Sequence, residues 1–163
     1  MLFPGCKALT SLDLSACTSL TKIGSEAFYG CTGLTSLDLS ACTSLTKIDS
    51  WTFKGCAGLT EVKLPASLTK IGFEAFKGCK ALTEVKLPAS LTEIGKSAFA
   101  GCTGLTSAVF ADKNNWKVYD DDDYSGTPTP ISSSNLADPA TAAKYLREET
   151  YNGGYSDKYW KKN

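Results

Sequence analysis

The chain has 163 residues, a length that suits a single domain. Its 17 basic and 17 acidic residues balance, so it lacks the basic excess that is typical of nucleic-acid-binding proteins. No apolar run approaches the roughly 18 residues of a membrane-spanning helix, and the N-terminal "MLFPGCKALT" lacks the pattern of a secretory signal peptide.

The composition also argues against the usual kinds of catalysis. The chain contains no histidine, which removes the commonest general base and the commonest ligand of transition metals. It contains no phosphate-binding loop, dinucleotide-binding motif or serine nucleophile motif. We therefore predict that the protein is not an enzyme and uses no cofactor.

Residues 1–110 are built from one repeated phrase. Its markers are five cysteines that each follow a glycine, at intervals of 25, 25, 23 and 23 residues: Cys6, Cys31, Cys56, Cys79 and Cys102. Each cysteine opens a segment with alternating apolar positions, such as "CTGLTSLDL" or "CKALTEVKL". The longer units read "LSACTSLT" where the shorter ones read "LPASLT", and this insertion contains Cys17 or Cys42.

Equivalent apolar residues of successive units should stack into columns, because one such unit cannot bury its own apolar side. A period of 23–25 residues with an L-x-x-L-x-L core falls in the range of leucine-rich repeats. The sequence therefore predicts a β-rich solenoid of about five units. The expected columns are Leu9, Leu34, Leu59, Leu82 and Leu105, then Ile23, Ile48, Ile71 and Ile94, and then Phe28, Phe53, Phe76 and Phe99.

Two longer phrases, "SLTKIGSEAFYGCTGLTSLDL" and "SLTKIGFEAFKGCKALTEVKLPA", closely resemble the BspA-like leucine-rich repeats of bacterial surface proteins. The resemblance covers about residues 2–110. It implies a right-handed β-rich solenoid, a location at the cell surface or outside the cell, and adhesion to host proteins or other cells.

The two ends depart from the repeat. "LFPGC" aligns with "AFYGC", so Phe3 should occupy the column of Phe28, and no polar cap precedes it. We expect this end to continue in a longer protein or to be covered by another chain. Residues 111–163 should form a capping segment, with a last degenerate rung at 116–119 and a helix near 139–150 that starts from an Asp138 N-cap and Pro139.

The cysteines could bind metal, form disulfides or fill a buried slot. A zinc site needs about four converging ligands, whereas cysteines one rung apart lie in a line. Rungs about 4.8 Å apart would allow a disulfide by distance, but parallel Cβ directions disfavour one. We predict a structural ladder of buried, reduced thiols, and leave the redox state of Cys17 and Cys42 open. The predicted ladder is Cys6, Cys31, Cys56, Cys79 and Cys102.

The acidic run "YDDDDYSG" at 119–126 is a second candidate site. Clustered carboxylates suit calcium. The run lacks the spacing of a calcium-binding loop, so we favour a solvated turn.

The third candidate is the row of polar positions between the apolar ones of each strand. These positions should face solvent and line an extended surface of the kind that solenoids use to bind large partners. Ordinary solubilising surface explains them equally well. The candidate residues are Ser11, Asp13, Ser36, Asp38, Glu61, Lys63, Glu84 and Lys86, and the charge of the second column changes sign midway.

Two functions remain open. The first is a non-enzymatic module that binds a protein partner, on a host or another cell, through the strand-lined face. The second is a structural module that self-associates through its uncapped N-terminal rung.

Overall fold

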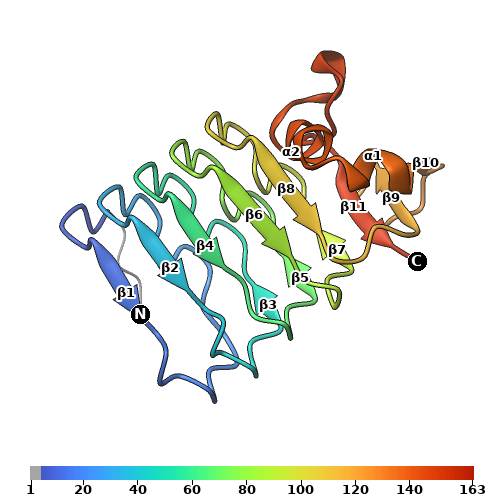
Figure 1. Cartoon of the computed structure of the whole chain (residues 1–163). Coiled ribbons are helices and arrows are strands. Elements are labelled where there is room, and N and C mark those ends of the chain that lie inside the picture. The colour runs from blue at the N-terminus through green and yellow to red at the C-terminus, as the bar shows by residue number, and fades with distance from the viewer. Residues whose placement is uncertain (1–4) are drawn as a thin grey trace.

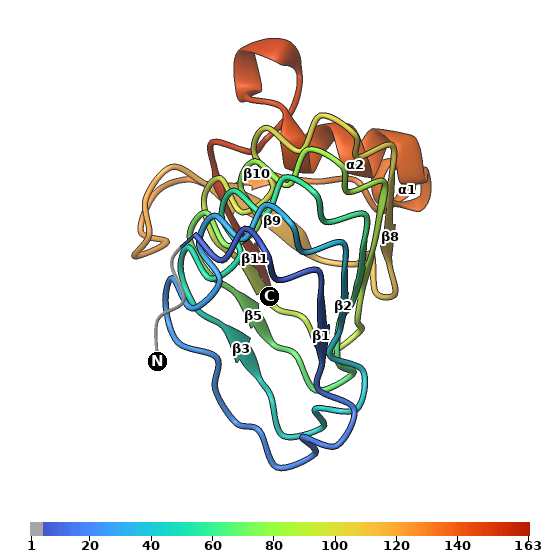
Figure 2. The same cartoon turned by 90° about the vertical axis from the view of Figure 1, so that its left-hand side faces the viewer.

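The computed structural model describes residues 5–163, so the prediction for Phe3 lies outside the described residues. The chain coils into a β-solenoid in which each repeat contributes one rung, and the rungs follow one another from the N-terminus toward the helices (Figure 1). Viewed along the stack, the rungs enclose a core between two strand-bearing sides (Figure 2). This architecture confirms the predicted solenoid.

The first side carries the strands of the "LTSLDL" and "LTEVKL" segments. Strands β1 (Ser11–Asp13), β2 (Ser36–Asp38) and β4 (Glu61–Lys63) form one parallel sheet. Strands β6 (Glu84–Leu87) and β8 (Ser107–Phe110) form a second parallel sheet. Strand partners occupy equivalent positions of successive repeats, so the register keeps each apolar column in line.

The second side carries shorter strands. Strands β3 (Lys47–Ile48), β5 (Lys70–Ile71) and β7 (Glu93–Ile94) are parallel, and Ile23 adds a bridge to Ile48. Strand β11 (Tyr159–Lys162) pairs antiparallel with both β7 and β9 (Trp116–Tyr119). Strand β10 (Thr129–Pro130) completes the sheet beside β9.

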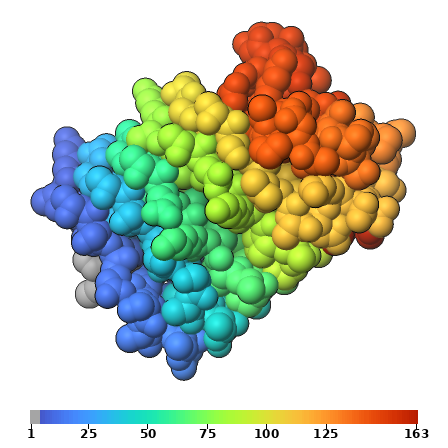
Figure 3. Space-filling model, viewed as in Figure 1, coloured from blue at the N-terminus to red at the C-terminus, as the bar shows by residue number. Residues whose placement is uncertain are grey.

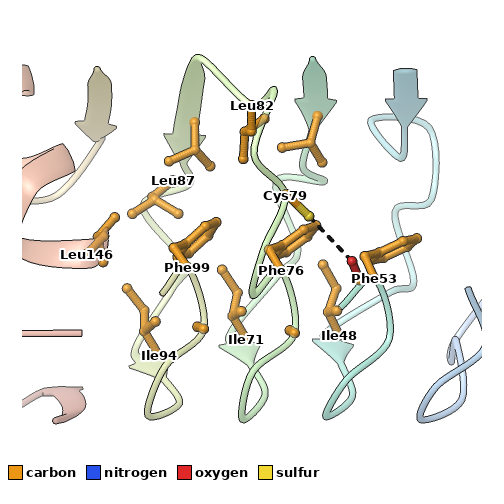
Figure 4. Packing of buried hydrophobic residues seen from close by; sticks show 14 of the residues in the cluster. Ile48, Phe53, Ile71, Phe76, Cys79, Leu82, Leu87, Ile94, Phe99 and Leu146 are labelled. Atoms are coloured by element: carbon orange, nitrogen blue, oxygen red, sulfur yellow. Dashed lines mark hydrogen bonds between the residues drawn. The ribbon is translucent and has the colours of Figure 1, made fainter. Parts of the chain in front are cut away.

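The core consists of the predicted columns. Leu34, Leu59, Leu82 and Leu105 are fully buried, whereas Leu9 of the first rung is half-buried. The phenylalanines stack face to face, with ring centroids 5.4 Å apart between Phe28 and Phe53 and 5.3 Å apart at each of the next two steps. Figure 4 shows this stack above the isoleucine column. Repetition of large side chains at one position thus brings equivalent rings into contact from rung to rung.

The glycine-linked cysteines lie beside the phenylalanine stack. Cys31, Cys56, Cys79 and Cys102 are buried, and Cys6 is half-buried. The Cys56 thiol donates to the carbonyl oxygen of Phe28 at 3.2 Å, and the next two thiols donate in the same way to Phe53 and Phe76 at 3.4 and 3.1 Å. Burial raises the pKa of Cys56 to about 12, so this thiol stays protonated and is a poor nucleophile.

The C-terminal segment covers the last rungs with helices and a strand. The helix that the sequence predicts is α2 (Pro139–Arg147), and Asp138 is its N-cap, accepting from the Thr141 amide at 3.1 Å. This helix ends before residue 150, because the chain turns into the 3₁₀ helix η1 (Thr150–Asn152). Helix α1 (Ser133–Ala137), which Ser132 caps, was not predicted.

The strand β11 differs from the sequence-based expectation in its position. The sequence predicts residues 116–119 as a last degenerate rung, and β9 occupies them, but β11 lies between β7 and β9 in the sheet. Trp160 on β11 is 1% exposed and stacks on Phe110, with ring centroids 6.0 Å apart. Trp160 thus packs over the end of the apolar columns.

Candidate functional site

The candidate binding residues all lie on one face, which we call the strand face: the outward positions of β1, β2, β4, β6 and β8. Inward and outward positions alternate along each strand because successive side chains point to opposite sides. Figure 3 views this side of the molecule, where the rungs appear as adjacent bands from blue to orange. All eight predicted residues are exposed there: Ser11, Asp13, Ser36, Asp38, Glu61, Lys63, Glu84 and Lys86.

The change of charge along the strand face has a local structural cause. In the longer units, Asp13 and Asp38 each accept the backbone N–H of the serine two residues later, Ser15 or Ser40, at 2.9 Å. The Ser40 hydroxyl and amide, followed by the Lys63 ammonium, lower the pKa of Asp38 to about 2. These aspartates therefore stabilise the turn that leads into the two-residue insertion.

The shorter units cannot form this turn bond. The residue two positions after Lys63 and Lys86 is Pro65 or Pro88, which has no N–H to donate. A carboxylate in place of Lys63 or Lys86 would find no N–H donor in the turn. This position therefore does not stabilise the turn in the shorter units. The two lysines are consequently better candidates for recognition than the two aspartates, a distinction that the charge pattern alone did not reveal.

The charged residues of the strand face form exposed ion pairs. Lys63 Nζ lies 3.1 Å from Asp38 on the neighbouring rung and 3.9 Å from Glu61, and Lys86 Nζ lies 3.1 Å from Glu84. Exposed pairs of this kind contribute about 0–1 kcal/mol. They can therefore exchange partners with a binding protein at little cost in stability.

The strand face is divided between β4 and β6. The sheet of β1, β2 and β4 and the sheet of β6 and β8 are separate, and a groove of about 650 Å³ lies at the division. At the paired junctions, the amides of Thr35, Thr60 and Thr106 donate to the preceding threonine carbonyl at 2.8–3.0 Å. Within the described residues, no such bond joins Thr83 to Thr60. The groove is lined by Thr60, Glu61, Val62, Lys63, Leu64, Thr83, Glu84 and Lys86.

One position of the repeat, which packs against the preceding rung, differs at the division. Gly33, Gly58 and Gly104 occupy one position of the repeat, and at each a Cβ would collide with the backbone of the preceding rung. At Gly104 that Cβ would lie 2.5 Å from the carbonyl oxygen of Lys80. Ala81 occupies the same position of the fourth unit and does carry a Cβ, as does Ala8 of the first unit, which no described rung precedes. The junction with alanine is not paired as a sheet and the three junctions with glycine are, although the Ala81 amide still donates to the Ala57 carbonyl oxygen of the preceding rung at 3.2 Å.

The threonine column has a structural role. The hydroxyl groups of Thr35 and Thr60 donate to the carbonyl oxygens of Thr10 and Thr35 at 3.0 and 2.9 Å. Hydrogen bonding to the backbone of the preceding rung therefore occupies these side chains.

The other two candidates show no convergent chemistry. Asp120 pairs with Lys158, and Asp123 accepts the Ser125 amide at 2.9 Å, as in an ordinary turn. Across residues 5–163, no group of three or more metal-ligating side chains comes together. Cys17 is a half-buried and Cys42 a buried free thiol.

No helix among the described residues is long and apolar enough to cross a bilayer. A search among curated protein sequences found no match to the chain.

Comparisons with known structures and families agree with this architecture. A leucine-rich repeat protein from Bacteroides ovatus is 34% identical, with a TM-score of 0.59 over 68% of this chain. A leucine-rich cell surface protein from Faecalibacterium prausnitzii is 28% identical, with a TM-score of 0.54 over 78% of this chain. The chain spans only 27% and 32% of the lengths of these two structures. The family model described as BspA type leucine-rich repeat region matches residues 1–121 in six copies, and the chain therefore belongs to the BspA-type leucine-rich repeat family.

Proposed function

We propose that this chain is a protein-binding module and that the β4–β6 groove is the centre of its binding surface. The groove carries the proposal because it is a break in an otherwise closed sheet, on the face where side chains of both charges gather. Four charged residues line it: Glu61, Lys63, Glu84 and Lys86. The binding partner is a protein on a host or another cell, and the module acts at the cell surface or outside the cell. The family and the cell-surface neighbour support this location.

The chemistry of the groove suits a polar segment of a protein rather than a small apolar ligand. Its rim offers ammonium and carboxylate groups in alternation, and its floor includes Val62 and the half-buried Leu64. The facing edges of β4 and β6 are not paired with each other, so backbone groups are available as well. Contacts of these three kinds, each modest, are typical of protein interfaces.

The test is charge reversal at the two lysines that have no turn to support. The unaltered chain is first screened by surface plasmon resonance against purified extracellular-matrix and cell-surface proteins. For each protein that binds, we expect the double variant Lys63→Glu and Lys86→Glu to bind about tenfold more weakly or worse, mainly through slower association. Lys80→Glu is the matched control, since Lys80 is exposed but lies outside the groove.

Two outcomes would contradict the proposal. Either no protein of the panel binds, or the double variant binds as tightly as the Lys80 control. Circular dichroism of all variants separates a lost contact from a lost fold.

Self-association is the second candidate function, and one observation favours it. Leu12, Leu14 and Leu20 of the first rung are half-buried, whereas the equivalent Leu37, Leu39 and Leu45 are at most 1% exposed. A second copy stacked on the first rung would bury this surface. Light scattering over a concentration series tests the idea, and a molar mass that stays at the monomer value throughout would refute it.

A further inference from the structure

A second groove, of about 540 Å³, lies on the other side of the solenoid from the strand face and shares no residue with the β4–β6 groove. It is formed where the corners of three successive repeats meet the loop around residue 124, which projects at the left of Figure 2. We call it the aromatic groove, after the four aromatic side chains that line it: Trp51, Phe73, Tyr124 and Tyr159. It is independent of the proposed function.

Two of these aromatic residues are exceptions to the repeat. Trp51 stands where the other units have Glu26, Glu74 and Ser97, and Phe73 stands where they have Ser25, Ser50 and Lys96. The two exceptions occur on adjacent rungs and meet edge to face, with ring centroids 5.5 Å apart and planes at 88°. The repeat itself requires only polar residues at these corners, so folding does not explain the aromatic pair.

The backbone makes tryptophan a costly choice at this corner. Trp51 has a φ of 58°, in the left-handed region, as do its equivalents in the other units. The conformation belongs to the repeat, and a bulky residue is rarely found in it, so tryptophan is less favourable here than the glutamate or serine of the other units. Burial does not fully offset this cost, because Trp51 is only half-buried whereas Trp116 and Trp160 are 1% exposed.

The charged side chains around the aromatic groove have a net charge close to zero. Lys47 Nζ lies 2.7 Å from Asp49, and Lys70 Nζ lies 2.6 Å from Glu93. Asp122 adds a carboxylate at the rim. The groove therefore offers hydrogen-bond donors and acceptors without the positive field that would attract a phosphate or a polyanion.

The backbone around the groove leaves no place for an added peptide strand. Strands β3, β5 and β7 are each paired on both sides, with β11 or the Ile23 bridge completing the set. A ligand must therefore bind through side chains: apolar faces on the rings, and hydroxyl groups on the surrounding polar atoms. A pyranose ring has this character, since its C–H groups pack on the electron-rich face of an aromatic ring and its hydroxyls lie at the edge.

We propose that the aromatic groove binds a neutral oligosaccharide, with sugar rings packed on Trp51 and Phe73 and sugar hydroxyls bonded to the surrounding lysines and Asp122. The groove is open at the surface and its volume falls within the range of small-molecule sites, so a short stretch of a longer glycan can enter it.

The experiment titrates the full chain with maltotriose, cellotriose and the trimer of N-acetylglucosamine. Since Trp51 is half-buried and the other two tryptophans are buried, intrinsic fluorescence reports the aromatic groove directly. We expect at least one trimer to change the emission in a saturable way. Calorimetry gives the affinity of the variants.

The variants restore the residues that the repeat itself uses. Trp51→Glu and Phe73→Ser should keep the fold, because Glu74 and Ser50 already occupy these positions in neighbouring units. Each should weaken sugar binding by about tenfold or more, the loss that follows removal of a central aromatic contact. The control Val109→Ser removes an exposed apolar side chain from the strand face and should leave sugar binding unchanged.

Three results would overturn the proposal: no saturable binding of any trimer, equal binding by Trp51→Glu and the unaltered chain, or preferential binding of decaproline or a heparin hexasaccharide. Binding of a protein partner by the strand face would be unaffected by any of them.

Discussion

The β4–β6 and β6–β8 junctions of the strand face are built from units of the same length, with partners offset by 23 residues. Only the second junction is hydrogen-bonded as a sheet. The chief local difference is Ala81 at the first junction and Gly104 at the second. The Ala81 methyl group, at a position that packs on the backbone of the neighbouring rung, is therefore the difference that the variants below test.

The comparison suggests where function is found in a repeat protein. Positions that follow the repeat build the columns and the ladder, and they leave little freedom for recognition. Positions that break it, such as Trp51 and Phe73, line the aromatic groove.

The largest effect is expected when the closed junction is forced open. Gly104→Ala places a Cβ 2.5 Å from the carbonyl oxygen of Lys80, closer than real contacts allow. Rungs there must separate, with loss of β6–β8 pairing, and we expect the free energy of unfolding to fall by about 1–3 kcal/mol. Urea denaturation followed by circular dichroism measures it.

The control for this variant is Gly24→Ala. No atom lies within 4 Å of a Cβ built at Gly24, so the same substitution should change stability little. Equal stability of Gly104→Ala and the unaltered chain would show that the methyl group does not separate the rungs.

The reverse substitution should close the open junction. In Ala81→Gly, the Thr83 amide can donate to Thr60 as its equivalents do, and we expect its hydrogen exchange to slow by about tenfold or more. The new backbone hydrogen bonds offset the conformational entropy that glycine loses on folding. The free energy of unfolding should therefore change by less than about 1 kcal/mol. Binding through the groove should weaken, because the cavity narrows.

Ala57→Gly provides the matched control, since Ala57 is a neighbouring alanine at a different repeat position. It should leave the exchange of the Thr83 amide unchanged. If Ala81→Gly also leaves it unchanged, the division of the strand face has another cause.

Much of the fold could be predicted from the sequence because the repeat specifies it many times over. The leucine, isoleucine and phenylalanine columns follow from periodicity, and the Asp138 cap follows from local chemistry. The position of β11 could not be predicted, because Trp160 is brought to Phe110 by a return of the chain that no local pattern encodes.

The candidate site was predicted only as a surface. Alternation in the strands identified its exposed residues, but the groove lies where strand pairing between β4 and β6 is interrupted, and pairing between rungs is not visible in a sequence. The exceptions at Trp51 and Phe73 were visible as departures from the repeat. Their meeting with Tyr124 was not, because the loop that carries Tyr124 lies far away in the chain.

The smallest predicted change in stability concerns the turns in which the longer units have an aspartate and the shorter units have a proline. Hydrogen bonds from Ser40, then Lys63, hold the pKa of Asp38 at about 2, below the ordinary value of 3.8. A lowered pKa in the folded state means that the charged carboxylate stabilises the fold above about pH 4, and that this contribution is lost as the pH falls toward 2. Because Asp38 is exposed, solvent screening limits the contribution to less than about 1 kcal/mol.

Asp38→Ala should therefore lower the free energy of unfolding at pH 7 by that small amount, and the difference from the unaltered chain should vanish near pH 2. Asp121→Ala, an exposed aspartate outside the repeats, should follow the unaltered chain at every pH. A constant difference between Asp38→Ala and the unaltered chain from pH 7 to pH 2 would mean that the side chain acts through packing rather than charge. The change from aspartate to lysine along the strand face would then need a cause other than the loss of the turn hydrogen bond in the units with proline.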